Sequence, residues 1–375
     1  MEVYSQKVNY QQTLKVAYFA VLLDGPQSGA AKKVNEQIRI WRATGVETEL
    51  FVVTNATDRH IWADSEQTQV FTDSSGIIKL FQRYKILKRI FNSNSNLVYI
   101  RDGFPFILPS TRKHTRLILE VQSNVQAEVF KRSKMKGFLS IFLDQLFLEK
   151  IDAFVFVSSE LSLTSRFRKF VTKRNHQVIS NGIDLSKFEI LPLPNKNIRQ
   201  AIFFMGQDGQ PWHGVNQIYD LAKQMQDFDF HIVGLRKPPG IEFTNIFHHG
   251  VLSQEEYLPI AAKCVAGIGS LNLISLGMRE ASPLKTRQYL AIGLPVISRY
   301  VDSDFGAESP FILSLPVGHE SIAVHEADIR QFCTRWSDKR VNGKDVQVID
   351  VNLKESNRLA FFKATASIKT WKSSS

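Results

Sequence analysis

The chain has 375 residues, 43% hydrophobic and 22% charged, which is enough for two domains with sizeable cores. Its formal charge of +11 favours an anionic partner such as a nucleotide phosphate or an acidic lipid surface, although a merely solubilising surface charge also fits. No apolar run reaches membrane-spanning length, and Cys264 and Cys333 lie too far apart for a disulfide framework or a cysteine metal motif, so we expect a reducing compartment.

The chain opens with a predicted strand, helix and strand over residues 14–23, 30–44 and 49–54. Apolar residues recur at helical spacing in the middle segment, and this βαβ order indicates a parallel sheet. The turn-rich loop that ends at Gly29 then lies at the carboxyl edge of the sheet, where open α/β sheets bind ligands. The loop lacks the full glycine pattern of dinucleotide-binding proteins, so the sequence argues against an NAD site here.

Two basic segments, 76–91 and 127–150, are predicted as helices with apolar faces. Each could cover the sheet as an ordinary core helix. Each could also rest on an anionic membrane surface through its lysines, arginines and aromatic residues. The sequence alone favours the core-helix interpretation and leaves the membrane interpretation open.

The strand–helix pattern continues and then restarts after a proline-bearing stretch at 190–197, which we interpret as a linker. Short apolar runs predict further strands at 96–101, 117–122, 151–158, 177–180, 201–205, 228–233, 245–249 and 265–270. Helical spacing predicts helices at 160–170, 215–226, 254–262 and 354–371. We therefore expect a first domain over 1–190, a second over 191–352, and a C-terminal helix and tail over 353–375.

The segment 278–298 combines a loop, a short helix and a strand. Ser282 is expected as the helix N-cap, with Pro283 at the first position, the helix over 284–292 and Gly293 as its left-handed end. Lys285 falls in the first turn, where a cation opposes the helix dipole. That unfavourable placement suggests a phosphate partner at the helix N-terminus, although an ordinary loop with a solvated lysine fits equally well.

Other acidic and nucleophilic residues give no strong motif. Asp227 and Asp229 precede a predicted strand and so lie at its amino end, away from the ligand edge. Asp302 and Asp304 follow a strand, but a surface turn is the favoured interpretation. The sequence predicts no metal site and no Ser–His–Asp arrangement.

Three stretches together resemble the GT-B glycosyltransferases, specifically the retaining family 4 group that uses nucleotide-sugar donors. They are ISNGIDLSKF at 179–188, FFMGQDGQPWHGVNQIYDLA at 203–222 and EASPLKTRQYLAIGLPVIS at 280–298. The resemblance implies an α/β GT-B fold, with two Rossmann-like domains whose parallel sheets face each other across a cleft. It also implies a C-terminal helix that returns to the first domain.

The resemblance further implies roles for individual residues. Glu280 would accept hydrogen bonds from donor-sugar hydroxyls, and Lys285 would stabilise the leaving diphosphate. The remaining donor-binding residues would be Gly206, Gln207, His213, Ser282, Leu284 and Gln288. Gln288, about 9 Å along the helix from Ser282, takes the place of the family's second glutamate and would hold the ribose. Gly29 and Gln122 would lie on the acceptor side, with Gln122 in place of a frequent histidine.

The implied activity is sugar transfer from a UDP- or GDP-type donor, with retention at the anomeric carbon, to a glycan, lipid-linked or protein acceptor. Polysaccharide biosynthesis, no metal or other cofactor, and a cytoplasmic or peripheral inner-membrane location are expected with it. Because glutamines replace family residues, a catalytically inactive subunit that binds nucleotide or an active partner remains an alternative. A sugar-nucleotide epimerase would need acid/base carboxylates in the cleft, which the sequence does not supply. A nucleic-acid-binding role is the weakest interpretation, because no basic–aromatic binding motif is present.

Overall fold

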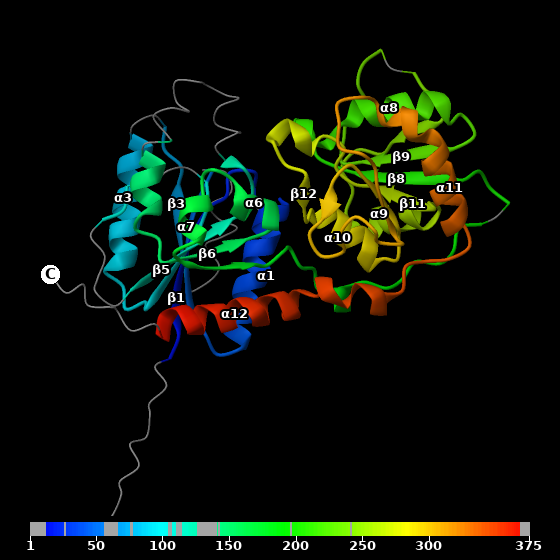
Figure 1. The fold of residues 1–375 in the computed structure, drawn as a ribbon. Coiled ribbons are helices and arrows are strands. Elements are labelled where there is room, and N and C mark those ends of the chain that lie inside the picture. Colours follow the sequence, from blue (N-terminus) through cyan, green and yellow to red (C-terminus); the bar gives the residue numbers. More distant parts are fainter. Residues whose placement is uncertain are drawn as a thin grey trace, which may run out of the picture. The chain divides into compact units, whose positions relative to one another are not determined.

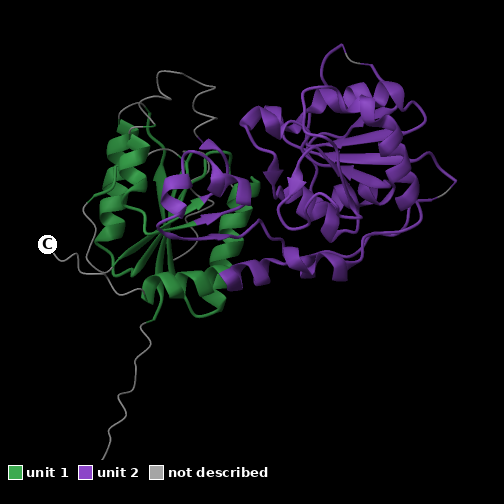
Figure 2. Ribbon diagram, in the orientation of Figure 1, with its two compact units in different colours: residues 1–120, 139–154, 358–375 green, residues 121–138, 155–357 purple. Residues whose placement is uncertain are grey.

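The computed structural model describes residues 13–25, 28–55, 67–75, 78–103, 107–109, 115–125, 141, 143–195, 197–240 and 242–367. The chain forms two compact units, shown in green and purple in Figure 2. The first comprises residues 1–120, 139–154 and 358–375, and the second comprises 121–138 and 155–357. The C-terminal residues thus return to the unit that contains the N-terminus, as the sequence predicts. The domain boundaries at 190 and 352 stay predictions.

The first sheet, of which Figure 1 labels β1, β3, β5 and β6, has seven strands in the order β3-β2-β1-β4-β5-β6-β7. Their bounds are β1 Lys15–Val21, β2 Glu47–Thr54, β3 Thr68–Thr72, β4 Leu97–Arg101, β5 Arg116–Val121, β6 Ala153–Phe156 and β7 Asn175–Val178. The pairs β1–β2, β1–β4, β2–β3 and β4–β5 are parallel. This agrees with the βαβ prediction, which did not include β3.

Aromatic residues join the helices of the first unit to its sheet. Helix α1, Gly29–Ala43, is capped by Ser28, whose hydroxyl accepts the Ala31 N–H. Its Trp41 contacts Tyr99 of β4 edge to face, and Phe362 of α12, Val351–Ser367, packs on both rings at centroid distances of 5.2 and 4.8 Å. Helix α3, Ile78–Phe91, buries Ile86, Leu87, Ile90 and Phe91. These contacts fix α1 and the returning end of α12 on the sheet.

A buried charged cluster lies in this core. Glu120 of β5 is fully buried and lies 3.1 Å from Lys33, 3.4 Å from Arg358 and 3.6 Å from Arg101, while Tyr18 donates a 2.9 Å hydrogen bond to it. Burial alone raises the pKa of Glu120, but the three cations outweigh burial and hold that pKa well below its ordinary value. The sheet strands β4 and β5, α1 and α12 therefore meet at one carboxylate.

The second sheet has six strands in the order β10-β9-β8-β11-β13-β15. Their bounds are β8 Ala201–Met205, β9 Asp229–Val233, β10 Ile246–His248, β11 Ala266–Ile268, β13 Val296–Ser298 and β15 Ile312–Ser314. Every neighbouring pair is parallel. The α-helices that connect or follow these strands in the chain are α8 Val215–Gln224, α9 Gln254–Ala262, α10 Leu284–Ala291 and α11 Glu326–Trp336. This second α/β layer system confirms the predicted restart of the pattern.

Two features differ from the sequence predictions. The helix expected over 160–170 is two short helices, α6 Ser159–Leu163 and α7 Arg168–Val171, because Thr164 is extended and its hydroxyl bonds back to Leu161. Helix α11 and strand β15 lie between residue 298 and the helix predicted at 354–371, where the sequence analysis names no element. Most of the basic segment 127–150 lies outside the described residues. Within the described part of the chain, no helix is both long and apolar enough to cross a membrane.

Candidate functional site

The loop after β8 is built around a close approach at Gly206. A Cβ at Gly206 would lie 2.8 Å from the Phe204 ring and 3.1 Å from Cδ2 of His213, so only glycine fits without displacing a ring. His213 ends the short 3-10 helix Pro211–His213 and is buried, and the exposed Gln207 donates its N–H to His213 Nε2 at 3.2 Å. The loop after β8 therefore holds the His213 ring in place through contacts at Gly206 and Gln207.

Lys285 reaches the same histidine from α10. Its Nζ lies 2.9 Å from His213 Nδ1 and 4.4 Å from the centre of the Phe204 ring. Burial lowers the pKa of Lys285 to about 7, and burial together with the Lys285 charge lowers the pKa of His213 to about 3. Because Nε2 accepts the Gln207 N–H, a neutral His213 carries its proton on Nδ1 and donates it to an uncharged Lys285 amine. The pair thus holds a lysine that can gain a proton near neutral pH.

The start of α10 lies next to this pair. Leu284 and Lys285 present backbone N–H groups that make no hydrogen bond within the described residues, and the N-cap, Pro283, has no side-chain acceptor to offer. An uncapped helix N-terminus of this kind offers free N–H donors and a partial positive charge. Gln288, one turn further along, is partly exposed.

The prediction of Ser282 as the N-cap of this helix is wrong. The buried Ser282 hydroxyl instead accepts the Asn181 N–H at 3.0 Å and donates to the Val157 carbonyl at 3.3 Å. Asn181 also donates its side-chain amide to the Ser282 carbonyl. Long-range partners therefore override the local capping preference, and Ser282 anchors the loop instead of capping the helix.

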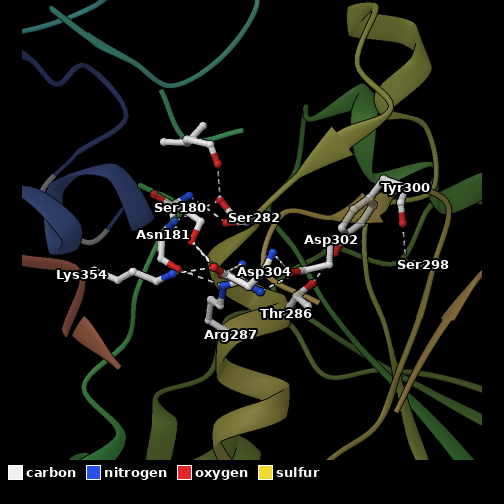
Figure 3. A network of polar contacts seen from close by, with 11 residues as sticks. Ser180, Asn181, Ser282, Thr286, Arg287, Ser298, Tyr300, Asp302, Asp304 and Lys354 are labelled. Carbon is white, nitrogen blue, oxygen red and sulfur yellow. Dashed lines mark hydrogen bonds and ion pairs between the residues drawn. The ribbon is translucent and has the colours of Figure 1, made fainter. Parts of the chain in front are cut away.

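The surface-turn interpretation of Asp302 and Asp304 is also wrong. Both side chains are nearly buried, and Arg287 of α10 bridges them at 2.7 and 2.6 Å while its Nε donates to the Asn181 carbonyl (Figure 3). Asp304 also binds Ser180 and Lys354. This network fixes the orientation of α10 and therefore of Lys285. The sequence analysis missed Arg287, because nothing in its helical spacing marks it as the partner of a later acidic turn.

Glu280 lies on the two-residue strand β12, Glu280–Ala281, which pairs in parallel with β14, Val301–Asp302. Its two carboxylate oxygens accept the N–H groups of Ser159 and Glu160, each at 2.9 Å. Each oxygen retains a lone pair for a further donor. Glu160 was not among the sequence-predicted residues.

The structure brings some of the predicted site residues together and leaves others apart. In the second unit, the described contacts join Gly206, Gln207, His213 and Lys285, with Leu284 beside Lys285 on the chain. Gly29 is the exposed first residue of α1 in the first unit, and Gln122 directly follows β5. Among the described residues, no three His, Cys, Asp or Glu side chains gather in a metal-binding group.

No protein-family model matches the sequence, and the comparison with curated proteins found no match. Its fold, however, is similar to solved structures over nearly the whole chain. The pneumococcal O-GlcNAc transferase GtfA, in complex with UDP and GlcNAc, has a TM-score of 0.62 at 10% identity, covering 95% of this chain and all of GtfA. HepE of Anabaena, in complex with UDP and glucose, has a TM-score of 0.60 at 13% identity and covers 94% of this chain and all of HepE.

A putative UDP-N-acetylglucosamine 2-epimerase from Listeria monocytogenes is also similar, with a TM-score of 0.53 at 12% identity over 96% of this chain and 98% of the epimerase. At such identities the likeness concerns the fold alone. The chain therefore has the GT-B fold, as the sequence resemblance implies. The fold by itself does not distinguish sugar transfer from epimerisation.

Proposed function

We propose that this protein is a glycosyltransferase that takes a sugar from a nucleotide diphosphate donor of the UDP or GDP type. The observation that carries the proposal is the uncapped N-terminus of α10 with Lys285 held against His213. Free backbone donors and a lysine that can become charged suit a diphosphate. The complexes of GtfA with UDP and GlcNAc and of HepE with UDP and glucose support this choice of ligand.

In the proposed mechanism, the N–H groups of Leu284 and Lys285 bind the diphosphate, and Lys285 gains a proton and stabilises the leaving group. Gln288 bonds the ribose, Ser282 fixes the loop before the helix, and Glu280 accepts hydrogen bonds from donor-sugar hydroxyls. Transfer proceeds with retention at the anomeric carbon, as in the family 4 group that the motifs resemble. We propose no metal cofactor, because Lys285 and the helix N-terminus supply positive charge at the diphosphate.

For the acceptor, we propose a glycan, lipid-linked or protein substrate, with Gly29 and Gln122 on its side, as in polysaccharide biosynthesis at the cytoplasmic face of a membrane. One stripe of α3 supports membrane contact. Ile78 and Phe81 are 64% and 62% exposed and share a helix face with Lys85, Lys88 and Arg89. Vesicles of anionic lipid should sediment the protein more than neutral vesicles, and Phe81→Ser should weaken that binding.

The alternative is an inactive GT-B subunit that still binds nucleotide. Its support is the amide side chain of Gln288, which bonds hydroxyls without the strength of a charged acceptor. Calorimetric titration with UDP, GDP and ADP, followed by donor hydrolysis assays, separates the two functions. Binding with turnover supports the transferase, binding without turnover favours the inactive subunit, and a failure to bind any nucleotide contradicts both.

A further inference from the structure

Two glutamates 120 residues apart hold each other's backbone. Glu280 Oε1 and Oε2 accept the N–H groups of Ser159 and Glu160, each at 2.9 Å. In return, Glu160 Oε2 accepts the N–H groups of Arg279 and Glu280 at 2.6 and 2.8 Å. We call this reciprocal set of four hydrogen bonds the glutamate clasp.

The clasp is the end of a longer contact between two segments of the second unit. Beyond it, Ser282 donates to the Val157 carbonyl, so residues 157–160 and 279–282 are joined at both ends. On its other side, the 279–282 segment is held by β14, because Val301 donates its N–H to the Arg279 carbonyl at 2.8 Å. Glu280 is therefore fixed from two directions, and Glu160 is the acceptor of its backbone N–H among the residues that the structure describes.

We propose that Glu160 is a positioning residue that sets the carboxylate of Glu280 for donor-sugar binding. This inference rests on the proposed role of Glu280. Each of the two carboxylates accepts two backbone N–H groups, and such charge-assisted hydrogen bonds hold both side chains in place. The bonds to the Arg279–Glu280 backbone need an acceptor oxygen at Glu160 but not its charge. A carboxylate that must meet sugar hydroxyls needs its position fixed to within a fraction of an ångström.

The geometry predicts that the two glutamates respond differently to an amide. Glu160 uses a single oxygen for both of its hydrogen bonds, so Glu160→Gln can keep both through the amide oxygen. Glu280 uses both oxygens, so Glu280→Gln turns an NH2 group toward a backbone N–H and loses one bond. Glu160→Ala loses both bonds and frees the Arg279–Glu280 backbone.

The test compares Glu160→Ala and Glu160→Gln with wild type. Glu255→Ala, an exposed glutamate of the first turn of α9, is the matched control. We expect Glu160→Ala to lower kcat about tenfold or more while the UDP affinity stays within about threefold, because the diphosphate site is untouched. Glu160→Gln and Glu255→Ala should keep kcat within about threefold. Wild-type kcat in Glu160→Ala, or no rescue by Glu160→Gln, overturns the proposal.

Hydrogen exchange of peptides covering 279–280 separates this proposal from the proposed function. If wild type turns over no donor, the proposed function fails, and with it the role in donor binding. Hydrogen exchange then still tests whether Glu160 holds the Arg279–Glu280 backbone in place. Slow exchange in wild type and Glu160→Gln, with exchange about tenfold faster in Glu160→Ala, supports it, and equal exchange in all three overturns it.

Discussion

Lys285 Nζ lies 2.9 Å from His213 Nδ1, while Nε2 of the same ring accepts the backbone N–H of Gln207. One imidazole thus connects the glycine loop after β8 to the first turn of α10. Because the ring has one proton in its neutral form, it can satisfy both neighbours only if Lys285 is uncharged. An arriving diphosphate would change this balance, since it favours the charged lysine.

The first prediction concerns pH. Burial lowers the pKa of Lys285 to about 7 in the free protein, and a bound diphosphate raises it again. Between these two pKa values, binding takes up a proton. The affinity for UDP or GDP should therefore fall as the pH rises above 7, by up to about tenfold per pH unit. Calorimetry in buffers of different ionisation enthalpy measures the proton uptake directly.

Lys285→Met is the variant that checks this assignment, because it removes the titrating group but keeps most of the apolar stem. It should lower affinity by about tenfold or more at pH 7 and abolish the decrease above pH 7. Lys223→Met, on an exposed lysine of α8, serves as the control and should retain both affinity and pH dependence. If the nucleotide affinity of Lys285→Met still decreased above pH 7, the pH dependence would belong to another group.

The second prediction concerns Gly206. In Gly206→Ala the new methyl group must displace the Phe204 or His213 ring, which costs about 1–3 kcal/mol of unfolding free energy. The displaced ring moves the partner of Lys285, so nucleotide affinity should fall as well. Gly103→Ala meets no atom of the described residues within 4 Å and should change neither quantity. Thermal unfolding and calorimetry on both variants measure the two effects, and unchanged values for Gly206→Ala would refute the close approach.

The third prediction concerns the buried cluster of the first unit. Glu120→Gln leaves Lys33, Arg101 and Arg358 without their carboxylate and should cost about 3–5 kcal/mol of stability. In the wild-type protein, Glu120 contributes its full stabilisation above the ordinary carboxyl pKa of 4.5. This stabilisation is lost as the pH falls, because folding lowers the pKa of Glu120. Denaturant unfolding at pH 7 measures the loss. Glu47→Gln, in an exposed pair with Lys15, should change stability by less than about 1 kcal/mol.

The fourth prediction concerns Arg287. A lysine in its place has no planar fork to bridge Asp302 and Asp304 while also donating to the Asn181 carbonyl, so Arg287→Lys should be destabilising. We expect a loss of about 2 kcal/mol or more. The exposed Arg236→Lys variant, in its pair with Asp208, should unfold like wild type. Equal unfolding of both variants would show that the bridge contributes nothing.

Elements of the fold were predictable where the signal was local. The buried strands around Phe19, Phe203 and Ile297 and the left-handed Gly293 follow from apolar runs and turn chemistry, and the structure has them within about two residues. The two-residue strand β12 depends on its tertiary pairing with β14, which no spacing rule includes. The break at Thr164 is local, but apolar spacing does not report the bond of its hydroxyl to the Leu161 carbonyl.

For the candidate site, the sequence indicated Lys285, Gly206 and His213 but not their partners. The contacts that organise the site join residues about 70 to 120 positions apart, as in Lys285 with His213 and Glu280 with Glu160. Ser282 is a further example of a long-range contact that the sequence does not show. Its hydroxyl accepts the Asn181 N–H instead of capping α10. The sequence analysis interprets Asp304 as part of a surface turn and makes no prediction for Arg287, whereas the fold joins the two in an ion pair.

The most direct test of the central claim is an NMR time course with UDP- and GDP-sugars as donors and a panel of glycan acceptors. We predict consumption of one donor by the wild-type protein, a product whose anomeric proton reports the donor's own configuration, and loss of turnover in Glu280→Ala with the fold intact. Inversion at the anomeric carbon would contradict the retaining mechanism. Turnover by Glu280→Ala at the wild-type rate would contradict the site.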